Sequence, residues 1–240
     1  MNRLRRLIQV MLGALALALL FTTVASAKPA KAASGDLLFA FEGEVRKGPS
    51  KGTELSGELK LTPNADGTVT GKLTLGGGSA IDVTGRLSNG NLSVAFDLGG
   101  TYVFGIGQAD EDGVFKGPFV GPAAGDSGKW EASPITKANF NFSGAVTRGP
   151  SEGTTLTGVL ALTIDIDNDF TGTLTLPDGT AIPVKGELNS SGSKIEVVFY
   201  LSDTLRIRGK GDATTGGGFA GPFRGPQPGD RGEWTATPAA

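Results

Sequence analysis

The chain of 240 residues contains no cysteine and no histidine. Without cysteine it has no disulfide, no thiolate metal site and no lipid-modified cysteine. Without histidine it has no Ser-His-Asp or Cys-His catalytic group, no histidine-ligated metal and no histidine to act as general base. An enzyme built from this sequence would depend on carboxylates, lysine, tyrosine or hydroxyl groups. We therefore expect no enzymatic activity, no metal site and no cofactor.

Concentrated charge is also lacking. The chain has 22 basic and 24 acidic residues, a formal net charge of −2. Three of the basic residues and none of the acidic ones lie in the first 27 positions, so the remainder has 19 basic against 24 acidic residues, a net charge of −5. No run of basic residues stands out along the sequence, which argues against nucleic acid as a partner.

A long apolar run occurs only at the N-terminus. Three arginines within the first six residues precede an apolar run over 7–24, and Ala25 and Ala27 provide the small residues of a signal-peptidase site. An uncleaved membrane anchor is the alternative, but Gln9 and two threonines interrupt the run. We predict cleavage after Ala27, no later membrane span, and a secreted, periplasmic or cell-surface location. The Ala-x-Ala site and the lack of disulfides suggest a bacterial source.

The rest of the chain consists of two similar copies. GPSKGTELSGELKLT, from position 48, recurs as GPSEGTTLTGVLALT from position 149. GPFVGPAAGDSGKWEA, from position 117, recurs as GPFRGPQPGDRGEWTA from position 221. The copies share mainly glycine, proline and alternating apolar residues, whereas two catalytic centres would share reactive side chains. The duplication therefore favours a shared scaffold over shared chemistry.

The repeat predicts the domain boundaries. We expect a signal peptide over 1–27, a flexible segment over 28–38, β-units over 39–132 and 140–238, and a linker over 133–139 that Pro134 stiffens.

Each unit has the two-residue period of β-strands, with glycine-rich or Asn-Gly turns between the strands. We predict an all-β fold, with about eight short antiparallel strands per unit in an up-and-down barrel; a β-sandwich is the alternative. Gly43, Gly57, Gly71 and Gly85 recur every 14 residues in the apolar phase, where they would let the sheet coil and close. Such barrels resemble avidins and lipocalins in architecture alone, since no motif of either family is present.

The closing motif of each unit contains its single tryptophan, Trp130 or Trp234. Either tryptophan is a candidate floor for a ligand pocket, and the alternative is a core residue that fills the space left by inward glycines. We interpret Asp126 and Asp230, in the same motif, as turn residues that bind their own backbone.

Two other motifs suggest ligand sites but lack the necessary residues. The GPSKGT and GPSEGT segments lack the lysine placement and the helix of a phosphate-binding loop, so we predict structural loops. Asp165, Asp167 and Asp169 alternate as in a calcium loop, but the sixth and twelfth positions do not fit one. We predict a hairpin turn there.

The two copies differ most on one strand. In the first unit its outward positions are apolar, and in the second they are basic: Tyr102, Phe104 and Ile106 against Arg206, Arg208 and Lys210. An outward apolar stripe on one unit suggests a partner surface. The basic stripe is either a surface for an anionic partner or a solvated face that protects an edge.

These observations favour an exported, non-enzymatic structural or interaction protein. The alternative is a barrel that binds a small molecule or a glycan, and its partner is then that ligand. An outer-membrane barrel and a carboxylate-based enzyme are less well supported. The interior volume of one unit separates the first two hypotheses, because a filled core excludes a ligand cavity.

Overall fold

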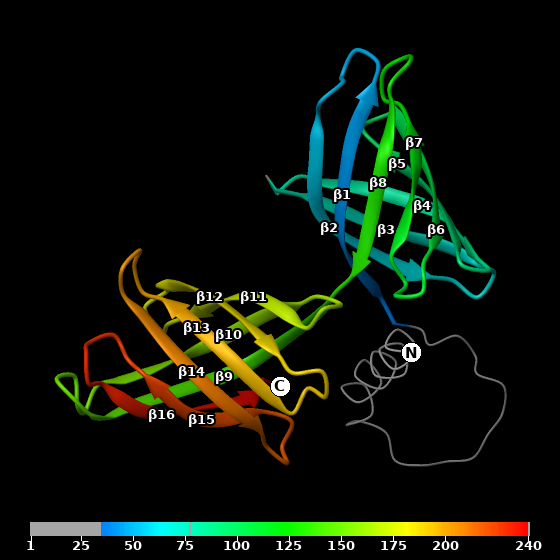
Figure 1. The fold of residues 1–240 in the computed structure, drawn as a ribbon. Helices are drawn as coiled ribbons and strands as arrows, with labels where there is room; N and C mark the ends of the chain where they lie inside the picture. Colours follow the sequence, from blue (N-terminus) through cyan, green and yellow to red (C-terminus); the bar gives the residue numbers. More distant parts are fainter. Residues whose placement is uncertain (1–34, 77, 240) are drawn as a thin grey trace, which may run out of the picture. The chain divides into compact units, whose positions relative to one another are not determined.

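The computed structural model describes residues 35–76 and 78–239, which form sixteen β-strands (Figure 1). The first eight strands are β1 (Leu37–Lys47), β2 (Glu54–Pro63), β3 (Thr68–Leu75), β4 (Ala80–Ser88), β5 (Asn91–Asp97), β6 (Tyr102–Ala109), β7 (Phe115–Val120) and β8 (Ser127–Pro134). The second eight are β9 (Thr136–Arg148), β10 (Thr155–Ile164), β11 (Asp169–Thr175), β12 (Ala181–Leu188), β13 (Lys194–Tyr200), β14 (Arg206–Ala213), β15 (Phe219–Arg224) and β16 (Arg231–Pro238).

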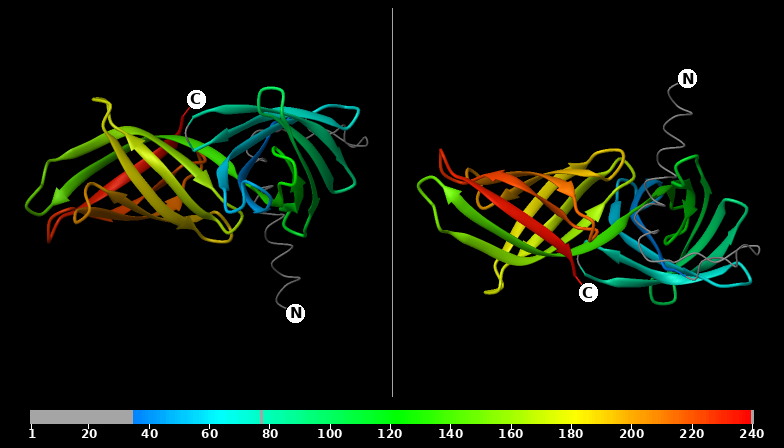
Figure 2. Two further views of the ribbon diagram at one scale, coloured as in Figure 1. Left: turned by 90° about the horizontal axis from the view of Figure 1, so that it is seen from above. Right: turned by 90° about the horizontal axis from the view of Figure 1, so that it is seen from below.

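Each set of eight strands closes into an antiparallel barrel, β1 to β8 and β9 to β16. Consecutive strands pair throughout, and the first strand of each set also pairs with the last. Figure 2 shows the strands of each barrel curving around it. The predicted pair of eight-stranded up-and-down barrels is confirmed, and the sandwich alternative is not. Closure leaves no unpaired sheet edge, which is the usual hazard of an all-β protein.

The core of each barrel is formed by the inward phase of its strands. In the first barrel Leu59, Leu61 and Leu92 are among the fully buried side chains. In the second barrel Leu160 and Leu174 are also fully buried. Each buried leucine stabilises the fold by about 1.5–3 kcal/mol relative to an exposed one. Without disulfides, this apolar burial is the main source of stability for each unit.

The inward glycines allow neighbouring strands to approach closely. A Cβ atom on Gly57 or Gly71 would collide with the backbone carbonyl oxygen of Thr74 or Lys60, respectively. Only glycine fits at such a contact, because backbone atoms cannot move aside as a side-chain tip can. These positions therefore permit the strong coiling that a small closed barrel needs.

The segments outside the units differ in part from the sequence prediction. The predicted signal peptide with its cleavage site lies outside the described residues, as does most of the predicted flexible segment, and β1 begins at Leu37. Of the predicted linker, residues 133–134 belong to β8 and residues 136–139 to β9, so Ile135 alone lies between strands. β8 extends to Pro134 because residues 133–134 pair with β1, and β9 begins at Thr136 because residues 136–139 pair with β10.

Candidate functional site

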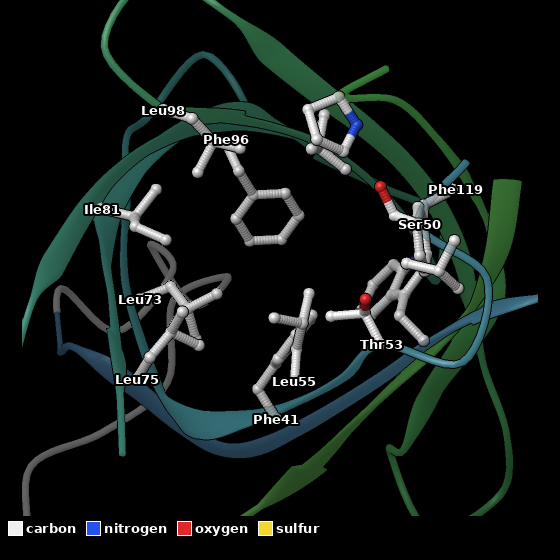
Figure 3. A pocket seen from close by; sticks show the side chains of 14 residues that line it. Phe41, Ser50, Thr53, Leu55, Leu73, Leu75, Ile81, Phe96, Leu98 and Phe119 are labelled. Atoms are coloured by element: carbon white, nitrogen blue, oxygen red, sulfur yellow. The ribbon is translucent and has the colours of Figure 1, made fainter. Parts of the chain in front are cut away.

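The first barrel contains a cavity of about 190 Å³ at the end where the β1–β2, β3–β4, β5–β6 and β7–β8 loops lie. Figure 3 shows the labelled side chains arranged around this space, with Phe41, Phe96 and Leu73 directed into it. The lining is apolar except for two hydroxyl side chains, and it consists of Phe41, Val45, Ser50, Thr53, Leu55, Leu73, Leu75, Ile81, Phe96, Leu98, Val103, Phe119, Pro122 and Trp130.

The lining changes from buried to exposed along the barrel. Phe41, Phe96 and Trp130 are at most 4% exposed and form the deep part. Leu55 is half-buried and Leu98 is 43% exposed, so these residues lie at the rim. The cavity is therefore an apolar funnel that reaches solvent at one end of the barrel.

Trp130 separates the cavity from the filled core. Its indole ring lies against Gly105 and Gly107, where a Cβ atom would come within 2.8 and 2.6 Å of the ring. The ring stacks on Phe41 at 6.1 Å between centroids, and its Nε1 donates a hydrogen bond to the Pro118 carbonyl at 3.1 Å. Trp130 is thus a core residue fitted against inward glycines, and it also borders the cavity. Its contact with a ligand stays a prediction, as does that of Trp234.

The second barrel has a matching cavity of about 160 Å³. Eleven lining positions correspond between the two cavities, and the residue is identical at ten of them; Val103 and Ile207 are the exception. Trp234 is 2% exposed, stacks on Phe142 at 6.0 Å and donates to the Lys210 carbonyl at 3.2 Å. The two copies therefore preserve the cavity lining together with the scaffold.

A buried carboxylate holds the β1–β2 loop at the cavity end. Asp126 accepts hydrogen bonds from the Ser50 amide at 3.0 Å, the Ser50 hydroxyl at 2.8 Å and the Ala123 amide at 3.3 Å. Hydrogen bonds from the Ser50 amide and hydroxyl, and then from Ala123, hold the pKa of Asp126 below its ordinary value, against the effect of burial. The expected bond within its own turn is present, but the main partner comes from the glycine-rich GPSKGT segment.

The same arrangement occurs in the second barrel. Asp230 accepts hydrogen bonds from the Ser151 amide at 2.9 Å and the Gln227 amide at 3.0 Å. Burial raises the pKa of Asp230, but the hydrogen bonds from Ser151 and Gln227 outweigh it and the net shift is downward. Two motifs that the sequence repeats far apart thus meet in each barrel. Their joint repetition was the signal that could have paired them.

The cavity lining offers apolar contact and a few hydroxyl groups, with no ionisable side chain among the lining residues of either barrel. Within residues 35–76 and 78–239, no cluster of three or more acidic, histidine or cysteine side chains is arranged to hold a metal. Asp165 instead accepts from the Asp167 and Asp169 amides at 2.9 and 3.0 Å, as in a hairpin turn.

The outward stripe of the first barrel lies on β6 and continues onto β7. Tyr102, Phe104 and Ile106 are 47%, 54% and 63% exposed. Val120, which pairs with Phe104 across the strands, is 55% exposed and extends the apolar surface. The sequence prediction missed Val120, although its counterpart Arg224 shows the same apolar-to-basic change. The role of this surface stays a prediction.

The corresponding face of the second barrel is basic. Arg206, Arg208 and Lys210 are exposed on β14. Arg206 lies over the Tyr200 ring at 5.0 Å, and Lys210 pairs with Glu196. Contact of this face with a partner also stays a prediction.

Among residues 35–76 and 78–239 there is no helix with the length and apolarity needed to cross a membrane.

No protein-family model matches the chain, and no curated protein matches it. The solved structures with limited similarity to this chain include the following three. An agglutinin from Burkholderia oklahomensis is 14% identical, with 85% of this chain and 97% of that chain covered and a TM-score of 0.25. The Myxococcus xanthus hemagglutinin in complex with a mannopentaose is 16% identical over 84% and 100%, with a TM-score of 0.25. A mutant transferrin binding protein B from Haemophilus parasuis is 9% identical over 86% and 77%, with a TM-score of 0.28.

Proposed function

We propose that this protein is an exported, non-enzymatic binding protein that takes up one small apolar molecule in each barrel. The observation that carries the proposal is the pair of corresponding cavities, with ten identical lining residues among eleven shared positions. An eight-stranded barrel is wide enough either to be filled by side chains or to hold one small ligand. A cavity in the same place in both copies favours the second use.

The size of the cavities suits a molecule of about one ring. An engineered apolar cavity of about 150 Å³ in another protein holds benzene. The two cavities here, at about 190 and 160 Å³, are of the same order.

The chemistry of the lining favours an apolar molecule over a sugar. A sugar presents many hydroxyl groups, and each one buried without a partner costs about 1–3 kcal/mol. The first cavity offers only Ser50 and Thr53 as side-chain partners. Ser50 already donates its hydroxyl hydrogen to Asp126. The flat faces of Phe41, Phe96 and Trp130 instead provide the apolar contact that an aromatic or aliphatic ring requires.

The test uses the full mature chain with toluene as the probe. Each cavity borders one tryptophan, so toluene should change the fluorescence of both, and calorimetric titration should give two sites per chain. Val103→Phe narrows the first cavity at a half-buried lining position and should reduce the count to one. The matched control is Val120→Phe, the same substitution at an outward position of β7, which should leave two sites.

Three outcomes would contradict the proposal. The first is no saturable binding of toluene or of other single-ring hydrocarbons. The second is an unchanged count of two sites in the Val103→Phe variant. The third is an equal loss in the Val120→Phe control, which would indicate that binding follows general stability and not the cavity.

The interaction-protein hypothesis retains one specific observation, the exposed apolar surface of Tyr102, Phe104, Ile106 and Val120. Exposed apolar patches of this kind mark contact surfaces in soluble proteins. Phe104→Arg with Ile106→Lys installs the residues of the second barrel at the same positions. Sedimentation velocity would then show a concentration-dependent association in the natural chain and its loss in this variant, if the surface joins two copies.

A further inference from the structure

The second barrel carries a row of four arginines that the sequence does not show as a run. Arg208 on β14 pairs with Arg224 on β15, and Arg224 pairs with Arg231 on β16. Arg231 in turn pairs with Arg148 on β9. All four are exposed and lie on four adjacent strands, so they form one continuous line across the outer surface.

The row is basic along its whole length. Within the described residues none of its four arginines forms an ion pair. Arg206 flanks the row on β14, and Glu233, two residues along β16 from Arg231, is the neighbouring acid on the outward phase. Like charges placed directly opposite across strands destabilise a sheet. A bound anion would offset the repulsion between the arginines, so the row favours anion binding.

The row curves around the barrel, and this curvature favours a flexible linear partner over a flat surface. In a closed barrel of eight strands each strand turns the surface by about 45°, so the outermost arginines of the row face directions about 135° apart. A flat lipid surface cannot contact all four at once. In addition, Glu152, Asp178 and Asp203 lie in the loops at this end of the barrel and would be repelled by an anionic membrane. A flexible polymer can follow the curve.

We propose that this row binds an acidic polysaccharide. Adjacent strand backbones are about 4.8 Å apart and the outward side chains diverge from them, so the four arginines can reach charged units spaced along one extended chain. The arginine guanidinium group binds carboxylate and sulfate groups through two parallel hydrogen bonds. The aromatic ring beside the row, Tyr200, is covered by the guanidinium group of Arg206 at 5.0 Å, so that face is not free to stack on a nucleic-acid base. This inference is independent of the proposed cavity function.

The experiment measures binding of the full mature chain to polygalacturonate at low salt, with neutral dextran as the reference polymer. We expect saturable binding to polygalacturonate that weakens as salt is added, and none to dextran. Arg208→Gln with Arg224→Gln removes two neighbouring arginines, half of the row, and should weaken binding about tenfold or more. The matched control is Lys129→Gln with Lys185→Gln, which removes the same charge from exposed positions on β8 and β12 and should change binding less than twofold.

The fold of each variant is checked by its thermal midpoint, which the arginine substitutions should leave unchanged or raise, because they relieve repulsion between like charges. Equal loss in both double variants would overturn the proposal, since binding would then follow net charge. Equal or tighter binding to single-stranded oligonucleotides or to anionic phospholipid vesicles would also overturn it. Retained toluene binding in a variant that loses polygalacturonate binding would separate this surface from the cavity.

Discussion

Replacement of Gly107 by alanine tests whether the inward glycines provide the space that the tryptophan ring occupies. The new Cβ atom would lie 2.6 and 2.7 Å from Cζ2 and Cη2 of Trp130, and 3.4 Å from the Phe115 Cβ atom. Carbon atoms prefer a separation of about 3.5–4.0 Å, so the overlap is close to 1 Å. The indole cannot withdraw freely, because it stacks on Phe41 and donates to the Pro118 carbonyl.

The expected cost of Gly107→Ala is about 1–3 kcal/mol of unfolding free energy, the usual range for overpacking a core. For a domain of this size each kcal/mol lowers the midpoint of thermal unfolding by roughly 4–8 °C. Trp130→Phe removes the two colliding ring atoms and should itself cost about 2 kcal/mol through the space it leaves. In that background the added methyl group fills space, so Gly107→Ala should cost close to zero. The double-mutant cycle should therefore give a coupling of about 1–3 kcal/mol.

Urea unfolding followed by circular dichroism measures all four members of the cycle. Trp234 is the single tryptophan left in the Trp130→Phe variants, so its fluorescence reports the second barrel as an internal reference. Gly76→Ala is the control, because a Cβ atom there meets nothing within 4 Å; it should change stability by less than about 0.5 kcal/mol. A neutral Gly107→Ala, or costs that simply add in the double variant, would refute the reasoning.

Two other predictions follow from the packing and the loop contacts. Gly71→Ala places its Cβ atom against the backbone carbonyl of Lys60, which cannot rotate away. We expect this substitution to lower the unfolding free energy by about 3 kcal/mol or more, a larger loss than for Gly107→Ala in the same urea assay. A smaller loss than for Gly107→Ala would contradict the close approach of the two strands. The folded-state pKa of Asp126 lies below its value of about 3.9 in the unfolded chain, so its contribution to stability is complete above that value and is lost as pH falls through the folded pKa. Urea midpoints measured from pH 6 to pH 2 should therefore fall less steeply in Asp126→Asn than in the natural chain, and parallel curves would contradict the assignment.

The repeat and the two-residue period were sufficient to predict the barrels. Alternation such as Leu59 and Leu61 with polar neighbours fixes which face of each strand is buried, and turn residues fix where strands end. These are local properties of the chain. The pairing of β1 with β8 is not local, but it follows once eight consecutive strands with inward glycines must bury one face and leave no edge.

The cavity could be predicted only in part. The sequence indicated Trp130 and Trp234 as residues of the barrel interior, but it offered pocket floor and core residue as alternatives. The structure shows that the Trp130 ring is a core residue and also lines the cavity, because it packs against Gly105 and Gly107 on one side and borders open space on another. The volume of that space depends on how fourteen side chains from separate strands and loops pack together, which no local pattern records.

The sequence by itself determined the duplication, the phase of the strands, and the absence of cysteine and histidine chemistry, since each depends only on which residues occur and in what order. Tertiary structure alone decided which distant residues meet. Asp126 binds Ser50, which lies 76 positions earlier, because barrel closure brings the β1–β2 and β7–β8 loops to the same end. Arg148, Arg208, Arg224 and Arg231 become neighbours because strand pairing sets their register. Local periodicity fixes which way a side chain points, and only the pairing of strands fixes what stands beside it.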